Sequence, residues 1–140
     1  MAHWLFPANA KRYDVLRAFG EPETYWPANT TVAVGDMVYI YLAAPYRQVG
    51  FVCKATEVGL DQERVLPRVR PFFKQPNKPK NKPKGFIKLR TTAAISLDPD
   101  SPLSYRHLKQ NGLSGMLMGP RRLENNPQLL EYITGVCREL

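Results

Sequence analysis

The chain has 140 residues, of which 44% are hydrophobic and 23% are charged, and its formal net charge at pH 7 is +8. This length suffices to bury a core without disulfides or metals, so we expect one domain over residues 1–140. No apolar run approaches the roughly 18 residues of a membrane span, no secretory signal is recognisable, and the two cysteines form no CxxC pair, so we expect no membrane segment and a reducing cytoplasm.

The first part of the chain predicts a strand followed by a helix. Trp4 to Phe6 is typical of a short buried strand, and Pro7 is expected to end it because proline removes a hydrogen-bond donor from the ladder. Between residues 11 and 19 the apolar side chains recur at helical spacing, and Gly20 supplies a stop signal. Residues 25–27 are then expected to form a loop.

The middle of the chain predicts two paired strands. Met37 to Leu42 alternates only partly, which indicates a strand buried on both faces, and Val49 to Val58 is expected to pair with it in antiparallel fashion. Gly59 is expected to interrupt the second strand. Residues 64–73 contain two prolines, so they are predicted to be an edge strand or an extended segment.

A segment rich in lysine and proline follows at about residues 74–85. Its five lysines supply five of the eight net charges, which leaves +3 for the rest of the chain. Repulsion between the lysines, three prolines and the lack of core-forming residues predict a flexible extended loop. Such a loop can contact phosphates without sequence preference, or it can be a solvated linker, and the sequence favours neither reading.

The last part of the chain predicts a strand at 86–97, a turn cluster at 98–102, and helices at 103–111 and 126–138. Short strands with helices packed around them give an α+β domain with a small curled sheet or open barrel.

Catalytic and metal-binding patterns are weak. His3 and His107 are far apart and have no cysteine or carboxylate nearby at metal-ligand spacing. The run 112–115 fails the G-x-S-x-G spacing of a nucleophile elbow, and no glycine motif of the phosphate-binding kind is present. Asp36 after a glycine is more typical of a turn than of a general base. We therefore expect no metal, no cofactor and no enzymatic activity.

Aromatic residues are concentrated near the start of the chain, where ten of the fifteen fall within the first 51 positions. Aromatic faces hold nucleobases by stacking, which contributes about 1–3 kcal/mol per base. Together with the positive charge, this pattern favours a module that recognises nucleobases. The alternative is an interaction protein whose aromatic residues all belong to the core.

Several segments together resemble the EVE domain, and the similarity spans nearly the whole chain. They are 4–9, Tyr25-Trp26, 34–41, 44–47, 108–113 and 119–123, of which the Gly-Asp-x-Val-Tyr-Ile-Tyr run at 35–41 is the most specific. EVE domains belong to the PUA-like superfamily with the YTH and ASCH domains. The resemblance implies a curved, barrel-like β-sheet flanked by helices. It also implies a reader of modified bases, in which a base is flipped into an aromatic pocket.

The resemblance also implies the residues of that pocket. In the YTH relatives a Trp after the first helix stacks on the methylated base, and Trp26 stands at the equivalent place, with a buried core Trp as the alternative. Asn9 could bond a base edge or cap the following helix. Tyr25, Tyr41 and Tyr46 could form the walls. Alternation along the strand puts Tyr41 on the same face as Tyr39, so at least one of the two is expected in the core.

Phosphate contacts are expected from arginines and from the lysine-rich loop, with a solvated surface as the alternative. The candidates are Arg47, Arg121, Arg122, Lys78, Lys80, Lys82 and Lys84.

The ligand that the resemblance implies is DNA with a modified cytosine, 5-methylcytosine or 5-hydroxymethylcytosine. EVE domains are paired with endonucleases, which implies a targeting role in modification-dependent restriction beside a fused or associated nuclease domain. RNA with a methylated base such as N6-methyladenine, as in the YTH relatives, is the competing ligand. A PUA-like enzyme that binds a nucleoside is the second class of function left open.

Overall fold

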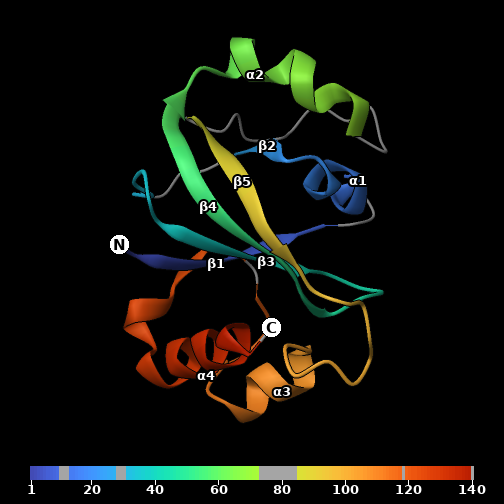
Figure 1. Cartoon of the computed structure of the whole chain (residues 1–140), viewed down its shortest axis with the longest axis vertical. Coiled ribbons are helices and arrows are strands. Elements are labelled where there is room, and N and C mark those ends of the chain that lie inside the picture. Colours follow the sequence, from blue (N-terminus) through green and yellow to red (C-terminus); the bar gives the residue numbers. More distant parts are fainter. Residues whose placement is uncertain (10–12, 28–30, 73–84, 118, 140) are drawn as a thin grey trace.

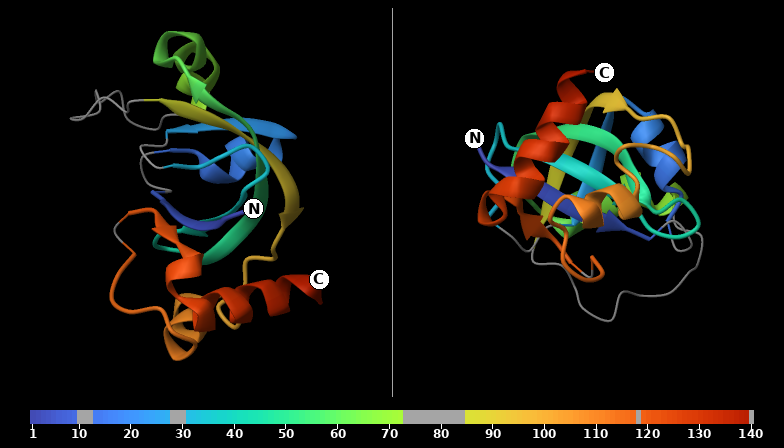
Figure 2. Two further views of the ribbon diagram at one scale, coloured as in Figure 1. Left: turned by 90° about the vertical axis from the view of Figure 1, so that its left-hand side faces the viewer. Right: turned by 90° about the horizontal axis from the view of Figure 1, so that it is seen from below.

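The structure of the chain is a computed structural model that describes residues 1–9, 13–27, 31–72, 85–117 and 119–139. Its strands form one six-stranded sheet in the order β2-β5-β4-β3-β1-β6. The strands are β1 (His3–Ala8), β2 (Glu23–Pro27), β3 (Met37–Leu42), β4 (Gln48–Leu60), β5 (Phe86–Ala94) and β6 (Arg121–Arg122). β1 and β3 run parallel, and every other neighbouring pair is antiparallel. The sheet curls strongly, as Figures 1 and 2 show.

Helices lie at both ends of the curled sheet (Figure 1). The helices are α1 (Val15–Gly20), α2 (Gln62–Val69), α3 (Tyr105–Gln110) and α4 (Pro127–Arg138), with 3-10 turns η1 (Arg70–Phe72) and η2 (Leu123–Asn125). α1 and α2 lie near β2, whereas α3 and α4 pack at the opposite end. Within the part of the chain that the structure describes, none of these helices has the length and apolarity to cross a bilayer.

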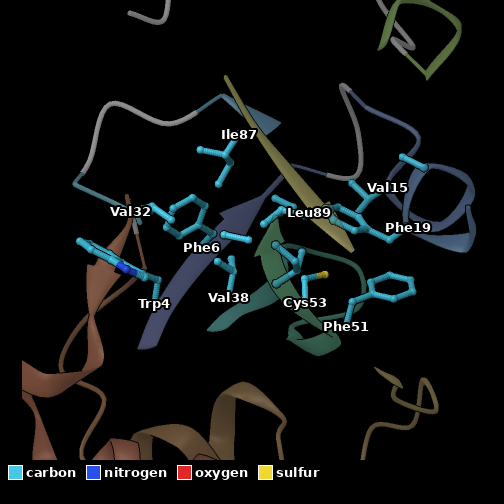
Figure 3. Close-up of a cluster of buried hydrophobic side chains, with 14 of the residues drawn as sticks. Trp4, Phe6, Val15, Phe19, Val32, Val38, Phe51, Cys53, Ile87 and Leu89 are labelled. Atoms are coloured by element: carbon cyan, nitrogen blue, oxygen red, sulfur yellow. The ribbon is translucent and has the colours of Figure 1, made fainter. Parts of the chain in front are cut away.

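The sheet separates two hydrophobic cores because successive residues of a strand point to opposite faces. From β3, Val38 and Ile40 enter the first core, which also contains Phe6 of β1 and Phe19 of α1. Figure 3 shows side chains of this first core converging from the strands and from α1. Tyr39 and the other side chains on the opposite face of the sheet enter the second core, which packs against α3 and α4. β3 is therefore buried on both faces, as its sequence predicts.

A single buried carboxylate fixes the entry to β3. Asp36 is 4% exposed. It accepts hydrogen bonds from the Ala2 N–H (2.9 Å), the Trp4 indole N–H (3.1 Å) and the Ala33 N–H (2.9 Å). Burial by itself raises the pKa of Asp36, but these hydrogen bonds to the charged form outweigh burial and lower the pKa. Asp36 thus ties the beginning of β1 to the beginning of β3.

Glu124 of η2 holds the beginning of β1 from the other side. Its carboxylate accepts the His3 N–H at 3.0 and 3.1 Å and lies 2.8 Å from His3 Nδ1. Burial raises the pKa of Glu124, yet the hydrogen bonds from His3 outweigh burial and lower it. The His3 ring also stacks on Tyr39, with ring centroids 6.2 Å apart.

Several predicted elements are confirmed. β3 covers Met37 to Leu42, and β4 pairs with it in antiparallel fashion. α4 begins after Asn126, whose side chain caps the helix by accepting the Leu129 N–H at 3.3 Å, and Pro127 occupies the first turn. The α+β class and the curled sheet follow from this arrangement.

Two predictions in the first part of the chain are wrong. Pro7 does not end β1, which continues to Ala8. β6 pairs only with Trp4 and Leu5, so the described strands flank β1 on one side alone at Pro7, where a missing donor is tolerated. In addition, residues 13 and 14 of the predicted helix are not helical: α1 begins at Val15, with Asp14 as its N-cap, while residues 11 and 12 lie outside the described residues.

Three further predictions are wrong for reasons of tertiary pairing. Residues 25–27 are not a loop but part of β2, because β5 pairs with them along its outer edge. Gly59 does not interrupt β4, which runs to Leu60 with irregular register against β5. Residues 64–72 are not extended: α2 and η1 form there, although Pro67 lies inside the helix. Val65 anchors α2 in the first core, where it is 2% exposed.

Candidate nucleic-acid interface

Four aromatic side chains are partly buried against the first core and partly exposed at the surface. They are Tyr25, Trp26, Tyr46 and Phe72; we call them the half-buried aromatic group. Such rings combine a fixed position with an accessible edge or face, which is the property that base stacking needs.

Trp26 of β2 is positioned by two rings of the core. Its centroid lies 5.4 Å from that of Tyr13 at an interplanar angle of 75°, and 5.4 Å from that of Phe19 at 47°. Tyr13 also packs on Phe72, with centroids 5.9 Å apart. The backbone N–H of Tyr13 donates to the carbonyl of Asn9 at 3.1 Å. Tyr13 therefore connects Asn9, Trp26 and Phe72, although they are far apart in the sequence.

Tyr13 lies at the centre of these contacts and is largely buried, with 8% of its surface exposed. Burial raises its pKa to about 12, against a hydrogen bond with Thr24 that acts to lower it. The phenol is therefore neutral at physiological pH.

Two exposed arginines stack on rings of this region. The guanidinium carbon of Arg68 lies 5.5 Å from the centroid of the Tyr25 ring, and Arg68 Nη1 donates to the Tyr25 hydroxyl at 2.7 Å. The guanidinium of Arg17 lies 5.5 Å from the centroid of Phe72. A stacked guanidinium keeps N–H donors at its rim that can bind phosphate oxygens. Both arginines are absent from the sequence prediction.

A surface hollow of about 360 Å³ lies between β2 and the segment α2–η1. Its lining residues are Glu21, Pro22, Glu23, Thr24, Tyr25, Arg68 and Phe72. The charges around it are mixed: Glu23 pairs with Lys88 at 2.8 Å, while Arg68 lies at the same hollow. Carboxylates repel phosphates but accept hydrogen bonds from base amino groups. Trp26 does not line this hollow.

Tyr41 lies on the other face of the sheet. It is 7% exposed in the second core, where its ring meets that of Tyr105 at 6.5 Å between centroids. Burial raises its pKa, and Tyr105 adds to this effect while Arg47 opposes it. Both Tyr39 and Tyr41 are in the core, as alternation along β3 predicts for at least one of them. Tyr41, which we expect from the sequence to form a wall of the pocket around Trp26, thus lies at a different core from Trp26.

Tyr46 and Arg47 occupy the hairpin between β3 and β4. Tyr46 packs against the first core. The side chain of Arg47 is exposed, and its backbone carbonyl accepts the N–H of Tyr105, which packs against the second core, at 2.8 Å. The peptide bond between Ala44 and Pro45 is cis, and Arg47 adopts a φ of 53°. The hairpin therefore connects the surfaces of the two cores.

The other predicted phosphate contacts have local partners. Arg121 donates from Nη1 to the Ser114 carbonyl and from Nη2 to the Met116 carbonyl, both at 2.9 Å. Arg122 lies over Trp4, with its guanidinium 5.9 Å from the ring centroid, and its Nε is 3.5 Å from Glu124. Lys78, Lys80, Lys82 and Lys84 lie outside the described residues. Among the described residues, no group of three or more His, Cys, Asp or Glu side chains is placed to hold a metal ion.

No protein-family model matches the sequence, and no curated protein sequence matches it significantly. Solved structures do match its fold. A hypothetical protein from Leishmania major is 15% identical, with a TM-score of 0.65 over 99% of this chain and 96% of that one. The ASCH protein of Zymomonas mobilis is 9% identical, with a TM-score of 0.59 over 95% of this chain and 94% of that one.

A further match is human THYN1, solved in complex with DNA that contains 5-methylcytosine. It is 11% identical, with a TM-score of 0.52 over 79% of this chain and 74% of that one. At these identities the likeness concerns the fold. The chain therefore shares the α+β fold of the ASCH protein and of THYN1, which agrees with the curved sheet flanked by helices that the resemblance to EVE domains implies. Membership of the EVE type itself stays a prediction.

Proposed function

We propose that this chain binds nucleic acid and reads a modified base, 5-methylcytosine or 5-hydroxymethylcytosine in DNA, at the surface around Trp26. The observation that carries the proposal is the placement of Trp26, whose ring is fixed by Tyr13 and Phe19 and remains partly exposed. Arg17 and Arg68 stack on two other rings of the half-buried aromatic group, Phe72 and Tyr25. The PUA-like fold supports the proposal, because THYN1 has this fold in its complex with 5-methylcytosine DNA.

The energies are compatible with such a reader. Flipping a base out of a duplex costs a few kcal/mol, and stacking on one aromatic ring contributes about 1–3 kcal/mol. Burial of one methyl group adds only about 1 kcal/mol, so affinity has to come mainly from phosphate contacts and stacking, with the methyl group deciding the preference. Arg17, Arg47 and Arg68 are exposed and can supply phosphate contacts.

The same proposal includes the setting of the protein. We expect the chain to bind without catalysing a reaction and to direct a fused or associated nuclease in modification-dependent restriction in the cytoplasm. The resemblance of segments such as 35–41 to EVE domains supports this part.

The test is a binding titration of wild-type protein and two Trp26 variants at one fixed salt concentration. The labelled probes are DNA oligonucleotides that differ only in one cytosine, 5-methylcytosine or 5-hydroxymethylcytosine, and an RNA with one N6-methyladenine. Trp26→Leu keeps an apolar side chain against the core but removes the π-face, whereas Trp26→Phe keeps a smaller one. The stacking energy of about 1–3 kcal/mol predicts roughly a tenfold loss of affinity for the modified strand in Trp26→Leu and a smaller loss in Trp26→Phe. The preference for the modified base, to which burial of the methyl group contributes roughly fivefold, should disappear in Trp26→Leu and persist in part in Trp26→Phe.

Other outcomes reject parts of the proposal. If Trp26→Leu discriminates as wild type does, the pocket is elsewhere. Preference for the methylated RNA favours the YTH-like alternative. Conversion of an oligonucleotide or a nucleoside in the same mixtures rejects the non-enzymatic part. Circular dichroism of each variant controls for folding.

A further inference from the structure

The face of the sheet that carries the second core continues beyond it as a charged surface. On this face the second core includes Val52 of β4 and Ala93 of β5. Figure 2 shows these two strands on the outside of the molecule in its left view. Beyond the core, five residues with charged side chains form what we call the charged sheet face. They are Glu23, Lys54, Glu57, Lys88 and Arg90.

Lys54 and Arg90 stand directly opposite each other on the neighbouring strands β4 and β5. Their chain neighbours Ala55 and Leu89 are buried in the first core, so the two cations project from the opposite face. Lys54 is half-buried and Arg90 is exposed. The Cα atoms of directly opposed residues in an antiparallel pair are about 5 Å apart, so two positive charges share one small area.

The carboxylates of the charged sheet face do not neutralise this pair, because a third cation engages them. Lys88 Nζ lies 2.8 Å from Glu23 Oε2 and 3.8 Å from Glu57 Oε1. Within the part of the chain that the structure describes, neither Lys54 nor Arg90 forms an ion pair. Like charges directly opposite each other destabilise a sheet. The pair therefore opposes folding and leaves two positive charges uncompensated.

This pair is a local conflict between the sequence and the fold, beside the candidate nucleic-acid interface. Natural proteins accept such conflicts mainly at functional sites. The register places Arg90 opposite Glu23 of β2, which lines the surface hollow together with Tyr25 and Arg68. Arg90 is thus one strand away from the hollow, and Lys54 is two strands away.

We propose that Lys54 and Arg90 together bind the phosphate backbone of a nucleic acid. This inference rests on the nucleic-acid binding in the proposed function, but it does not depend on which base is read. Each DNA strand carries one charge per about 3.4 Å of helix axis, so two cations about 5 Å apart contact one phosphate or two successive ones. A bound phosphate also offsets the repulsion between the two cations. Because phosphate contacts carry no sequence information, the pair adds affinity without adding preference.

The experiment compares two double variants that lose the same formal charge. Lys54→Gln/Arg90→Gln is the pair variant. Arg106→Gln/Lys109→Gln is the matched control, because both residues are exposed cations on α3, which lies at the opposite end of the molecule from α2 (Figure 1). Fluorescence anisotropy gives the affinity for one labelled DNA duplex, with and without 5-methylcytosine, at several salt concentrations. Vesicles that contain phosphatidylserine are a second anionic probe, and circular dichroism controls for folding.

For the pair variant we expect DNA affinity about tenfold weaker than that of wild type at low salt. The slope of log K against log salt concentration should become smaller by about 2, because each lost phosphate contact reduces it by about 1. The control variant should keep the wild-type slope. The ratio of the affinities for modified and unmodified DNA should stay the same in both variants.

A single substitution separates the effect on binding from the effect on stability. Lys54→Glu turns a repulsive pair across the two strands into an attractive one, so this variant should unfold at a higher urea concentration than wild type. It should nevertheless bind DNA more weakly than Lys54→Gln, because the new carboxylate repels phosphate. Arg90→Lys keeps the charge and should bind DNA within about twofold of wild type.

The two proposals fail in different ways. If the pair variant has the DNA affinity and salt slope of the control variant, the inference is rejected while base reading by Trp26 stands, even if binding to the vesicles is lost. Wild-type protein that binds all strands equally, with a smaller salt slope in the pair variant, rejects base reading and supports the inference. Wild-type protein that binds no nucleic acid rejects both.

Discussion

Replacement of Asp36 by alanine should destabilise the fold by about 3 kcal/mol. The substitution removes the acceptor of three hydrogen bonds, of which the bond from the Trp4 indole is buried. A hydrogen bond to a charged group contributes about 1.5–3 kcal/mol, and a donor left buried without a partner keeps its desolvation penalty. The N–H groups of Ala2 and Ala33 are more accessible, so water replaces much of what they lose and each adds only about 0.5 kcal/mol.

Urea unfolding measures this loss. Tryptophan fluorescence follows the transition, and circular dichroism provides an independent probe of two-state behaviour. Asp36→Asn preserves the shape of the side chain but turns an amide donor toward groups that are themselves donors. It should therefore lower the free energy of unfolding by about 2 kcal/mol. Asp100→Asn is the matched control, because Asp100 is exposed and its carboxylate lies 3.7 Å from exposed Arg106. A loss below about 1 kcal/mol in Asp36→Ala would refute the reasoning.

The same carboxylate predicts the acid sensitivity of the fold. Because the folded pKa of Asp36 is lowered, its contribution to stability is complete above the unfolded pKa of about 4. It is lost as the pH falls through the lower folded pKa. The unfolding free energy of wild type should therefore decrease below about pH 4, and the decrease should be smaller in Asp36→Asn. Identical pH profiles for the two proteins would contradict this assignment.

Two further substitutions probe the packing. A Cβ on Gly50 would lie 2.5 Å from Cδ1 of Leu42, a residue that is fully buried. Gly50→Ala should therefore lower the free energy of unfolding, measured in urea, by about 1–3 kcal/mol. Gly20→Ala should leave it unchanged, because the space around the new methyl group is open. Glu124→Gln weakens the attachment of β1 to η2 and should lose about 1 kcal/mol near neutral pH; because the folded pKa of Glu124 is lowered, the difference from wild type should shrink in acid. A double-mutant cycle with His3→Gln measures how much of that loss belongs to the pair, and no coupling would contradict the assignment.

The sequence predicted correctly those elements whose own residues carry the signal. Met37 to Leu42 is apolar throughout because both faces of β3 meet a core, and Asn126 followed by Pro127 carries its own helix start. The segment at 62–72 was misassigned because its prolines act as strong local breakers. In the structure Pro67 lies late in a short helix that Val65 anchors, an effect of tertiary packing that no local pattern reveals.

The candidate site depends even more on contacts between distant residues. Arg17 meets the ring of Phe72, and Arg68 meets that of Tyr25, only after α1, β2 and α2 have come together. An exposed arginine on a helix gives no sign in the sequence of the ring it will cover. The separation of Tyr41 from Trp26 has the same origin. Alternation predicts that Tyr41 lies on the same face of β3 as Tyr39, but it does not predict which core that face meets.

The position of β1 has a consequence for how the chain folds. Trp4 pairs with Val38 on one side and with Arg122 on the other. Both neighbours of β1 in the sheet therefore come from later parts of the chain. Pairings between distant segments slow folding relative to a helical domain of the same size, because the loop between them has to close first. The ladder of β1 with β3 can form once residue 42 has been synthesised, but the edge of β1 that pairs with β6 stays open until Arg121 and Arg122 have been synthesised. Its apolar edge is thereby open to mispairing, and binding by chaperones at this stage should favour the native sheet.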